Sequence, residues 1–492
     1  MIKEMLRSTV GWPAGTNALD IDSITSSGEY RTEHDSIGEK EVPMDAYFGV
    51  QSLRAAENFR ITGLSTHPEM INCLAHIKKA AAIVNAELGY LDKSISEAIV
   101  TACDEILKGR FREHFIVDPI QGGAGTSLNM NANEVIANRA IEILGGNKGD
   151  YSIVHPNDHV NLSQSTNDVI PTAGKMTAIR LMMQLTVQLS CLDLAFSKKA
   201  GEFNHVIKMG RTQMQDAVPI RLGQEFRAYS DSIKRCIARI KKAVDELRPV
   251  NIGGTAIGTG INADKEYLDR IVSVLNEISG LELRQANDLI DSTQNLDPFV
   301  AASGAVKTCA VALSKIASDL RLMSSGPKAG FGEIKLPSMQ NGSSIMPGKV
   351  NPVIPEVVNQ VAFNVIGNDT TITLAAEAGQ LELNAFEPIV FYNLFQSIDT
   401  LGYAAETFVD NCVSGIEANE ERCRELVENS VGIVTVLAPY TGYERAADIA
   451  KKALETGRPV REVIAEEGIM ESDELDRILD PFSMTEPTCI KE

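Results

Sequence analysis

The 492-residue sequence predicts an all-α fold built from long packed helices. Hydrophobic residues make up 44% of the chain and aromatic residues only 5%, which favours aliphatic packing between helices over an aromatic-rich β-sandwich. In residues 221–250 the apolar positions follow one another at spacings of four and three, as on a bundle helix: Leu222, Phe226, Tyr229, Ile233, Cys236, Ile240, Val244 and Leu247. Because the chain exceeds the usual size of one core, we expect two or three domains or one long-helix assembly.

Four segments are predicted along the chain. Residues 1–30 have no sustained period and predict an irregular arm, which carries Trp12, the single tryptophan. Residues 31–165 mix short helical stretches with Gly/Asn-rich loops and predict a mostly helical N-terminal domain. Residues 166–420 predict a central domain of long helices, and residues 421–492 predict a small C-terminal helical domain.

Two stretches inside the central segment need a separate interpretation. A long helix is predicted to open at Pro355, since proline is tolerated at the first helical position, and to run to Asn384. Between Met176 and Phe196 the only charged residues are Arg180 and Asp193, so the composition approaches that of a membrane span. Interrupting Thr, Gln and Ser residues favour a buried bundle helix instead.

Charge and cysteine content limit the class of partner. The chain has 46 basic and 66 acidic residues, a net charge of −20, which repels nucleic acid and anionic membranes at long range. A small anionic substrate stays compatible if one pocket supplies lysine, helix N-termini and neutral donors. Eight cysteines without a CxxC pair, and no apolar leader in the first thirty residues, lead us to expect a reduced, cytoplasmic protein without nucleic-acid or membrane partners.

The segment GSSIMPGK comes close to two known catalytic motifs and matches neither. A phosphate-binding loop needs four residues between its glycines and a hydroxyl after the lysine, whereas five residues separate Gly342 from Gly348 and Val350 follows Lys349. The same segment lacks the last glycine of the G-x-S-x-G elbow of hydrolases. Neither an NTPase nor a serine hydrolase is therefore favoured.

Two further motifs are weak. HPNDH (155–159) has histidines at a metal-binding spacing, but Pro156 opposes a helix and the glutamate of H-E-x-x-H is missing, so polar loop histidines are favoured over zinc. NIGGTAIGTGIN (251–262) follows a helical stretch rather than a strand, which speaks against a dinucleotide loop. It predicts either a tight turn or a loop lining a site with Thr255 and Thr259.

Four polar loops, nearly free of metal-ligand clusters, hold the remaining candidates. Their hydroxyl and amide side chains donate hydrogen bonds without adding charge, which suits the binding of carboxylates and the stabilisation of an oxyanion. The candidates are Thr126, Ser127 and Asn129; Ser165, Thr166 and Asn167; Thr212 and Gln213; and Ser343, Lys349 and Asn351.

These loops resemble the conserved blocks of the fumarase/aspartase superfamily. GSSIMPGKVNP (342–352) is similar to its signature, and four other blocks match in the expected order: QGGAGTSLNMNANE (121–134), SQSTND (163–168), GRTQMQDA (210–217) and GGTAIGTGIN (253–262). The resemblance covers nearly the whole chain from Arg31 onward. Within the superfamily it is closest to the ammonia-lyases that act on aspartate, particularly over residues 351–384.

The resemblance implies a three-domain, all-helical subunit with a long central helix bundle, in a homotetramer whose active sites are each assembled from three chains. It implies that Ser343 is the general base that takes a Cβ proton from L-aspartate, and that Lys349 and Asn351 bind a substrate carboxylate. The other substrate-binding residues that it implies are Thr126, Ser165, Thr166, Asn167, Thr212 and Gln213. No cofactor is expected to be required, with a divalent cation such as Mg²⁺ as an optional activator.

The implied chemistry requires that two anions be stabilised, one on the substrate and one at Ser343. Removing a proton beside a carboxylate creates an enediolate dianion, which the clustered donors would stabilise. Lowering the pKa of the Ser343 hydroxyl by about six units requires about 8 kcal/mol of alkoxide stabilisation, and its expected sources are Lys349, loop N–H groups and a closing lid.

Other functions stay open at this point. Class II fumarate hydratase is the main alternative, but fumarases typically carry histidine at the position of Gln213 and a second serine at that of Thr166. Ammonium leaves as neutral ammonia and needs less acid catalysis than hydroxide does, so Gln213 favours deamination. A structural lens protein of this superfamily, or a lyase for succinyl-amine compounds, are more distant alternatives.

Overall fold

The computed structural model describes residues 28–469 and 471–487 of the 492-residue chain. The predicted irregular arm, with Trp12, lies outside these residues except for its last three positions, so its conformation stays a prediction.

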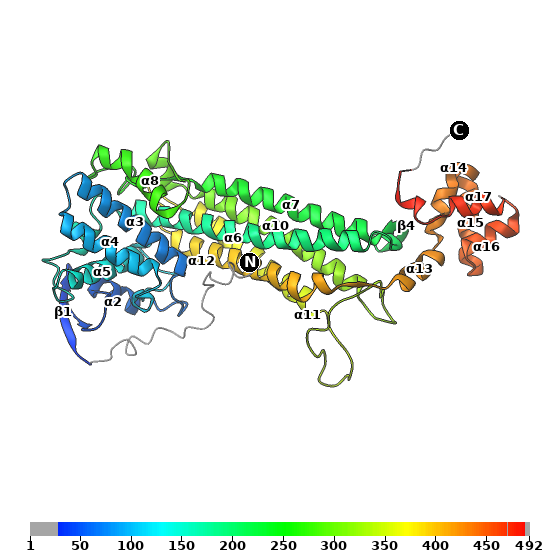
Figure 1. Ribbon diagram of the computed structural model, residues 1–492, viewed down its shortest axis with the longest axis horizontal. Helices are drawn as coiled ribbons and strands as arrows, with labels where there is room; N and C mark the ends of the chain where they lie inside the picture. Colours follow the sequence, from blue (N-terminus) through cyan, green and yellow to red (C-terminus); the bar gives the residue numbers. More distant parts are fainter. Residues whose placement is uncertain (1–27, 470, 488–492) are drawn as a thin grey trace. The chain divides into compact units, whose positions relative to one another are not determined.

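The all-α prediction is confirmed, since α-helices dominate the described chain (Figure 1). Their bounds are α2 Val50–Asn58, α3 Pro68–Glu87, α4 Lys93–Leu107, α5 Thr126–Ile143, α6 Thr166–Glu202, α7 Leu222–Leu247, α8 Lys265–Ser279, α9 Leu289–Gln294, α10 Asp297–Met323, α11 Val353–Glu377, α12 Glu387–Asn411, α13 Glu420–Glu428, α14 Ala438–Thr441, α15 Tyr443–Thr456, α16 Val460–Glu467 and α17 Ser472–Ile478. Short 3₁₀ turns occupy Arg112–His114, Val413–Gly415, Val431–Leu437 and Ser483–Thr485, and a π-helical turn occupies Pro156–Val160.

Small strand pairs, which the sequence did not predict, join the helices. Three of the four described pairs are antiparallel, and the β5–β6 pair is parallel. The pairs are β1 Tyr30–Asp35 with β2 Gly38–Pro43, β3 Ile207–Thr212 with β4 Gln215–Arg221, β5 Pro249–Val250 with β6 Arg284–Gln285, and β7 Ile334–Lys335 with β8 Glu417–Ala418.

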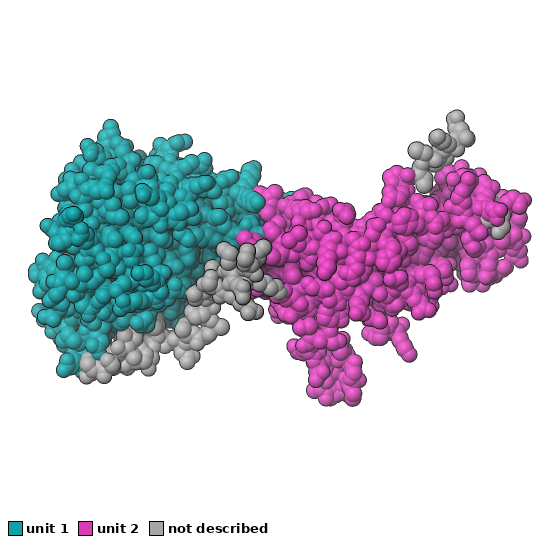
Figure 2. All heavy atoms as spheres, in the orientation of Figure 1, with its two compact units in different colours: residues 1–186, 239–307, 364–400 teal, residues 187–238, 308–363, 401–492 magenta. Residues whose placement is uncertain are grey.

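The chain forms two compact units (Figure 2). The first contains residues 1–186, 239–307 and 364–400, and the second contains residues 187–238, 308–363 and 401–492. The boundaries of the three predicted domains stay a prediction.

The periodicity of the predicted bundle helix is confirmed by α7. All eight of its predicted apolar positions are buried, from Leu222 to Leu247. The helix predicted from Pro355 to Asn384 begins two residues earlier and ends at Glu377. It stops because the Asn384 side-chain amide donates to the carbonyls of Ala375 and Ala376, both at 3.0 Å, and so takes the place of the next helical N–H groups.

By length and composition alone, α6 and α10 could each cross a membrane. Buried core helices pass the same test. The seven cysteines among the described residues form no disulfide.

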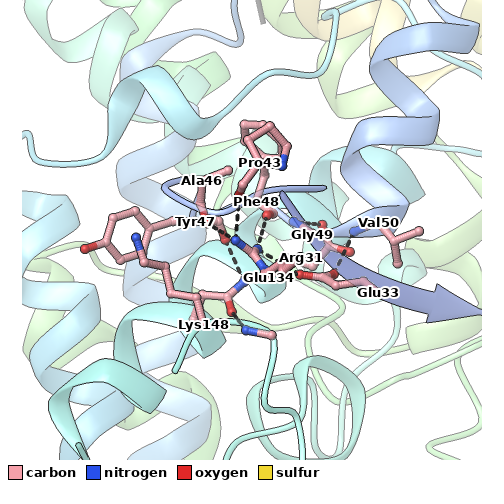
Figure 3. A network of polar contacts seen from close by, with 12 residues as sticks. Arg31, Glu33, Pro43, Ala46, Tyr47, Phe48, Gly49, Val50, Glu134 and Lys148 are labelled. Carbon is pink, nitrogen blue, oxygen red and sulfur yellow. Dashed lines mark hydrogen bonds and ion pairs between the residues drawn. The ribbon is translucent and has the colours of Figure 1, made fainter. Parts of the chain in front are cut away.

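A buried ionic network anchors the start of the first unit. In Figure 3 the Arg31 side chain points toward the backbone of the segment that precedes α2, and it donates to the carbonyls of Pro43, Ala46 and Phe48 at 2.8–3.0 Å. Its Nε donates to Glu33 at 2.8 Å. The arginine therefore binds several backbone carbonyls of this segment at once, and it neutralises a buried carboxylate.

The C-terminal helices of the second unit pack around their own apolar core. Met209 of β3 belongs to this core together with residues of α15 and α16, such as Ile449 and Val463. The Ser430 hydroxyl donates to Asp216 of β4 at 2.7 Å. These contacts fix the β3–β4 hairpin, whose tip carries two of the predicted site residues.

Candidate active site

Thr126 begins α5, and the turn before it depends on glycine. Gly125 has φ +83°, and a Cβ atom there would lie 2.9 Å from the Ile170 side chain of α6, so only glycine allows the backbone conformation and the close approach. The Thr126 hydroxyl donates to the Gly123 carbonyl at 2.7 Å. The exposed threonine therefore stands at a helix N-terminus, where backbone dipoles favour an anion.

Three predicted residues lie where α6 begins. Ser165 caps the helix, because its side-chain oxygen accepts from the Asn167 N–H at 3.3 Å. The Asn167 side-chain amide donates to the Ala256 carbonyl at 2.7 Å. Thr166 is half-buried between them. This second helix N-terminus therefore also presents neutral donors.

Asp168 holds this helix start against the glycine-rich loop at 251–262. Its carboxylate accepts backbone N–H groups from Ser165 at 2.9 Å, Gly253 at 2.9 Å and Thr255 at 3.0 Å. Burial raises the pKa of Asp168 to about 6, although these three hydrogen bonds oppose the shift. The glycine-rich loop is therefore part of the scaffold of the candidate site, and Asp168 was missed by the sequence analysis.

The two helix starts are joined directly. The Asn129 side-chain amide, which is 1% exposed, donates to the Thr166 hydroxyl oxygen at 3.3 Å. This bond links α5, which Thr126 begins, to the start of α6, where Ser165, Thr166 and Asn167 lie, and all of these residues belong to the first unit.

Thr212 ends β3 and Gln213 begins the turn of the β3–β4 hairpin, in the second unit. Gln213 and Met214 have φ +53° and +65°, which is the conformation of a two-residue hairpin turn that glycine or asparagine usually fills. Gln213 is exposed. A non-glycine pair in this strained conformation is the kind of feature that accumulates at functional sites.

The hairpin is held by ion pairs at its base. Arg211 bonds Glu333 at 2.7 Å, and Lys208 approaches the same carboxylate at 3.2 Å. The Arg211 guanidinium also lies over the Phe331 ring, 4.2 Å from its centroid. Since Glu333 is fully buried, these contacts set the position of the turn that follows Arg211.

The signature loop closes on itself. The Gly342 N–H donates to the Lys349 carbonyl at 3.0 Å, and the Asn351 side chain donates to the Gly342 carbonyl at 2.8 Å. A Cβ atom on Gly342 would lie 2.4 Å from the Lys349 carbonyl oxygen. Asn351 thus closes the loop as well as being a predicted substrate ligand, while the Lys349 side chain is exposed.

Ser343 receives the backbone donors that the sequence analysis expected. Its Oγ accepts the N–H of Ile345 at 3.2 Å and that of Met346 at 3.0 Å. Hydrogen bonds donated to an oxygen favour its anionic form. An alkoxide at Ser343 would keep a third acceptor direction for a substrate proton, so the geometry suits a base.

The HPNDH segment forms a helical turn, contrary to expectation. Residues Pro156–Val160 make one π-helical turn, because the His155 Nδ1 accepts the N–H groups of Asn157 at 3.3 Å and Asp158 at 3.1 Å and so caps it. His155 and Asn157 line a polar cavity of about 610 Å³ together with Ser127. No three His, Cys, Asp or Glu side chains gather around a metal position in residues 28–469 and 471–487.

Two protein-family models match the chain. A model described as lyase matches residues 38–367, and one described as fumarase C C-terminus matches residues 433–486. The chain belongs to the fumarase/aspartase superfamily. Its signature blocks and its helical fold are those that the superfamily resemblance predicted.

Close relatives within the superfamily share one activity by name. The chain is 55% identical over 464 residues to an aspartate ammonia-lyase of Bacillus subtilis, covering 94% of this chain and 98% of the relative. It is 52% identical over 464 residues to an aspartate ammonia-lyase of Helicobacter pylori, covering 94% and 99%. The prediction of a carbon–nitrogen lyase is therefore confirmed.

Solved structures of the superfamily confirm the fold. A fumarate lyase:delta crystallin from Brucella melitensis, bound to cobalt, has a TM-score of 0.91 and 52% identity, covering 93% of this chain and 100% of that one. A class II fumarase from Schistosoma mansoni has a TM-score of 0.89 with 34% identity, covering 93% and 99%. At this lower identity, fumarate hydratase is the less supported alternative.

Proposed function

We propose that this chain catalyses the reversible deamination of L-aspartate to fumarate and ammonia. The observation that carries the proposal is the near full-length identity of 50–55% to aspartate ammonia-lyases. The residues at the two positions that the resemblance uses to separate fumarases, Thr166 and Gln213, agree with it.

In the proposed reaction Ser343 acts as the base. Its alkoxide takes a proton from Cβ of L-aspartate, and the electron pair of the C–H bond moves into the adjacent carboxylate to give an enediolate dianion. The pair then returns to form the carbon–carbon double bond as the C–N bond breaks, and nitrogen leaves with its electrons as neutral ammonia. The N–H groups of Ile345 and Met346 supply part of the alkoxide stabilisation.

The carboxylates and the ammonium group are held by the neutral donors of the candidate site. Ser165, Thr166 and Asn167 supply hydroxyl and amide groups at the start of α6, and Thr126 stands at the start of α5. Thr212 and Gln213 contribute from the hairpin turn, with Lys349 and Asn351 from the signature loop. Gln213 has no titrating proton, which suits a leaving group that departs as neutral ammonia.

We also propose that the enzyme works as a cytoplasmic homotetramer whose active sites are shared between subunits. Large apolar side chains exposed along two long helices support this assembly: Leu194 at 68% on α6, and Phe363 at 64% and Leu374 at 63% on α11. Exposed apolar surface of this kind marks association sites, and a second copy is its expected cover.

The decisive assay compares two substrates of the purified protein. We expect equal amounts of fumarate and ammonia from L-aspartate, and negligible conversion of fumarate to malate without ammonia. A Ser343→Ala variant should lose several orders of magnitude in kcat with its assembly intact, because the proton acceptor is gone.

Two outcomes would contradict the proposal. Dominant malate formation would assign a hydratase, and a Ser343→Ala activity within about tenfold of wild type would remove Ser343 as the base. The assay is repeated with a chelator and with added Mg²⁺. Activity should persist with the chelator, because no step of the proposed reaction uses a cation and Mg²⁺ is proposed only as an activator.

A further inference from the structure

Lys78 is a lysine with no solvent exposure in the first unit. It lies on α3, in the segment IKKAAAIVN, at 0% exposure. Its ammonium donates to the Asn161 Oδ1 at 2.8 Å and to the Gln164 Oε1 at 3.0 Å. Burying an ammonium costs free energy unless hydrogen bonds or an opposite charge replace its lost hydration.

A lysine side chain fixes the orientation of its amide partners. A protonated lysine only donates hydrogen bonds, whereas an asparagine or glutamine amide can turn over to present either its oxygen or its nitrogen. Lys78 therefore holds the Asn161 side chain with its oxygen toward the lysine ammonium. The Asn161 nitrogen then donates to the Gln164 carbonyl at 3.1 Å.

The fixed oxygen of Asn161 in turn orients Asn129. The Asn129 Nδ2 donates to the Asn161 Oδ1 at 3.2 Å and to the Thr166 Oγ1 at 3.3 Å. Since Thr166 accepts this bond, its own hydroxyl proton is free to point elsewhere. Lys78 and Asn129 thus both donate to the Asn161 oxygen, and Asn129 donates again to Thr166, so a chain of fixed donor and acceptor roles connects Lys78 to a proposed substrate ligand.

We propose that Lys78 is a positioning residue that fixes the donor and acceptor roles in the chain Lys78–Asn161–Asn129–Thr166, so that the Thr166 hydroxyl is presented as a donor to a substrate carboxylate. This inference rests on the proposed function, because it assigns Thr166 to carboxylate binding. Lys78 itself does not touch the substrate.

The charge of Lys78 decides how firmly it fixes the Asn161 amide. Burial lowers the pKa of Lys78 to about 7, while the Asp168 carboxylate opposes the shift. A neutral amine still carries two N–H groups, which are enough for both of its bonds. The neutral amine also has a lone pair that can accept an N–H, so it is the protonated form that excludes a turned Asn161 amide.

The test compares Lys78→Met with Lys79→Met. Lys79 is the next residue on α3, and its ammonium pairs with Asp104 at 2.6 Å at the edge of the helix. We expect Lys78→Met to raise the KM for L-aspartate and the Kd for succinate by about 10- to 100-fold, since an oriented donor to a carboxylate is lost. The kcat should change less, and Lys79→Met should resemble wild type.

A double-mutant cycle separates positioning from loss of structure. Thr166→Val removes the end of the chain, so adding Lys78→Met to it should raise the KM less than about twofold further. Effects of the two substitutions that multiply in full would overturn the inference. A Lys78→Met enzyme with KM and Kd within about twofold of wild type would also overturn it.

A second variant covers the case in which Lys78→Met does not fold. Asn161→Leu keeps the lysine but cuts the chain, and it should give the same rise in KM and Kd. Wild-type values in a folded Asn161→Leu enzyme would overturn the inference. If wild-type protein does not deaminate L-aspartate, the proposed function fails by that result alone, independently of the comparison between variants.

Discussion

Glu134 is a buried carboxylate at the point where α2 begins. At 2% exposure, it accepts the N–H groups of Gly49 at 2.8 Å, Gln51 at 2.9 Å and Ser52 at 3.1 Å. Burial raises its pKa to about 7 in spite of these donors, and the neighbouring Glu33 carboxylate adds to the shift. The first unit therefore carries a carboxyl group that binds its proton more tightly when folded.

This shift predicts how stability changes with pH. Because the pKa of Glu134 rises from 4.5 to about 7 on folding, the folded state binds more protons between these values. The free energy of unfolding should then fall by up to about 3 kcal/mol as pH rises through that range. Urea unfolding of wild type and Glu134→Gln at pH 5 and 7.5, at one protein concentration, measures it.

Glu134→Gln is neutral at every pH and should lack this part of the slope. It should also show an offset that is independent of pH, because its amide nitrogen faces backbone donors. Parallel pH profiles for the two proteins would show that Glu134 does not titrate in this range.

Residue-scale features of the site differ in how far the sequence predicts them. Backbone donors to Ser343 were expected from the chemistry of a serine base, and the loop provides two of them. A role for Lys78 in the site was not predicted. The position of Lys78 in the apolar stripe of α3 indicates that the side chain is buried, but it does not show which amides the ammonium bonds. A lysine inside such a stripe was the available signal.

At the scale of elements, the signature loop depends on one glycine. A Cβ atom at Gly342 would lie 2.4 Å from the Lys349 carbonyl oxygen and 2.9 Å from the Asn351 nitrogen. Gly342→Ala should therefore open the loop and misplace Ser343, which lowers kcat by about 100-fold. Helical circular dichroism should stay unchanged, since no helix is touched.

Gly201→Ala is the matched control for this substitution. Gly201 lies in α6, and a Cβ atom there meets nothing within 4 Å, so its kcat should equal that of wild type. A Gly342→Ala enzyme with wild-type kcat would mean that the closed loop is not needed for the chemistry.

Helices were predicted better than their ends or the strands. The α7 pattern depends on eight buried positions, which a local period reports well. The end of α11 depends on a side chain seven residues beyond it, Asn384, and the π-helical turn at Pro156–Val160 depends on a histidine cap. The β3–β4 hairpin is held by the C-terminal helices, a long-range contact that no local pattern contains.

At the scale of the whole molecule, the predicted site residues are divided between the two units. Thr126, Ser165, Thr166 and Asn167 belong to the first unit, while Thr212, Gln213, Ser343, Lys349 and Asn351 belong to the second. Motif resemblance assigned all of them to one site. Periodicity could not do so, because it carries no information on which copy of the chain supplies each block.

The central claim is that each site combines blocks from different subunits, and subunit mixing tests it most directly. Ser343→Ala and Asn167→Ala proteins, each inactive alone, are unfolded together in equal amounts and reassembled. Random mixing leaves each position wild type half the time, so about a quarter of the sites should be intact and about a quarter of wild-type activity should return. Mixed assembly, verified by two tags on one tetramer, with no return of activity would place both residues on one chain and contradict the account.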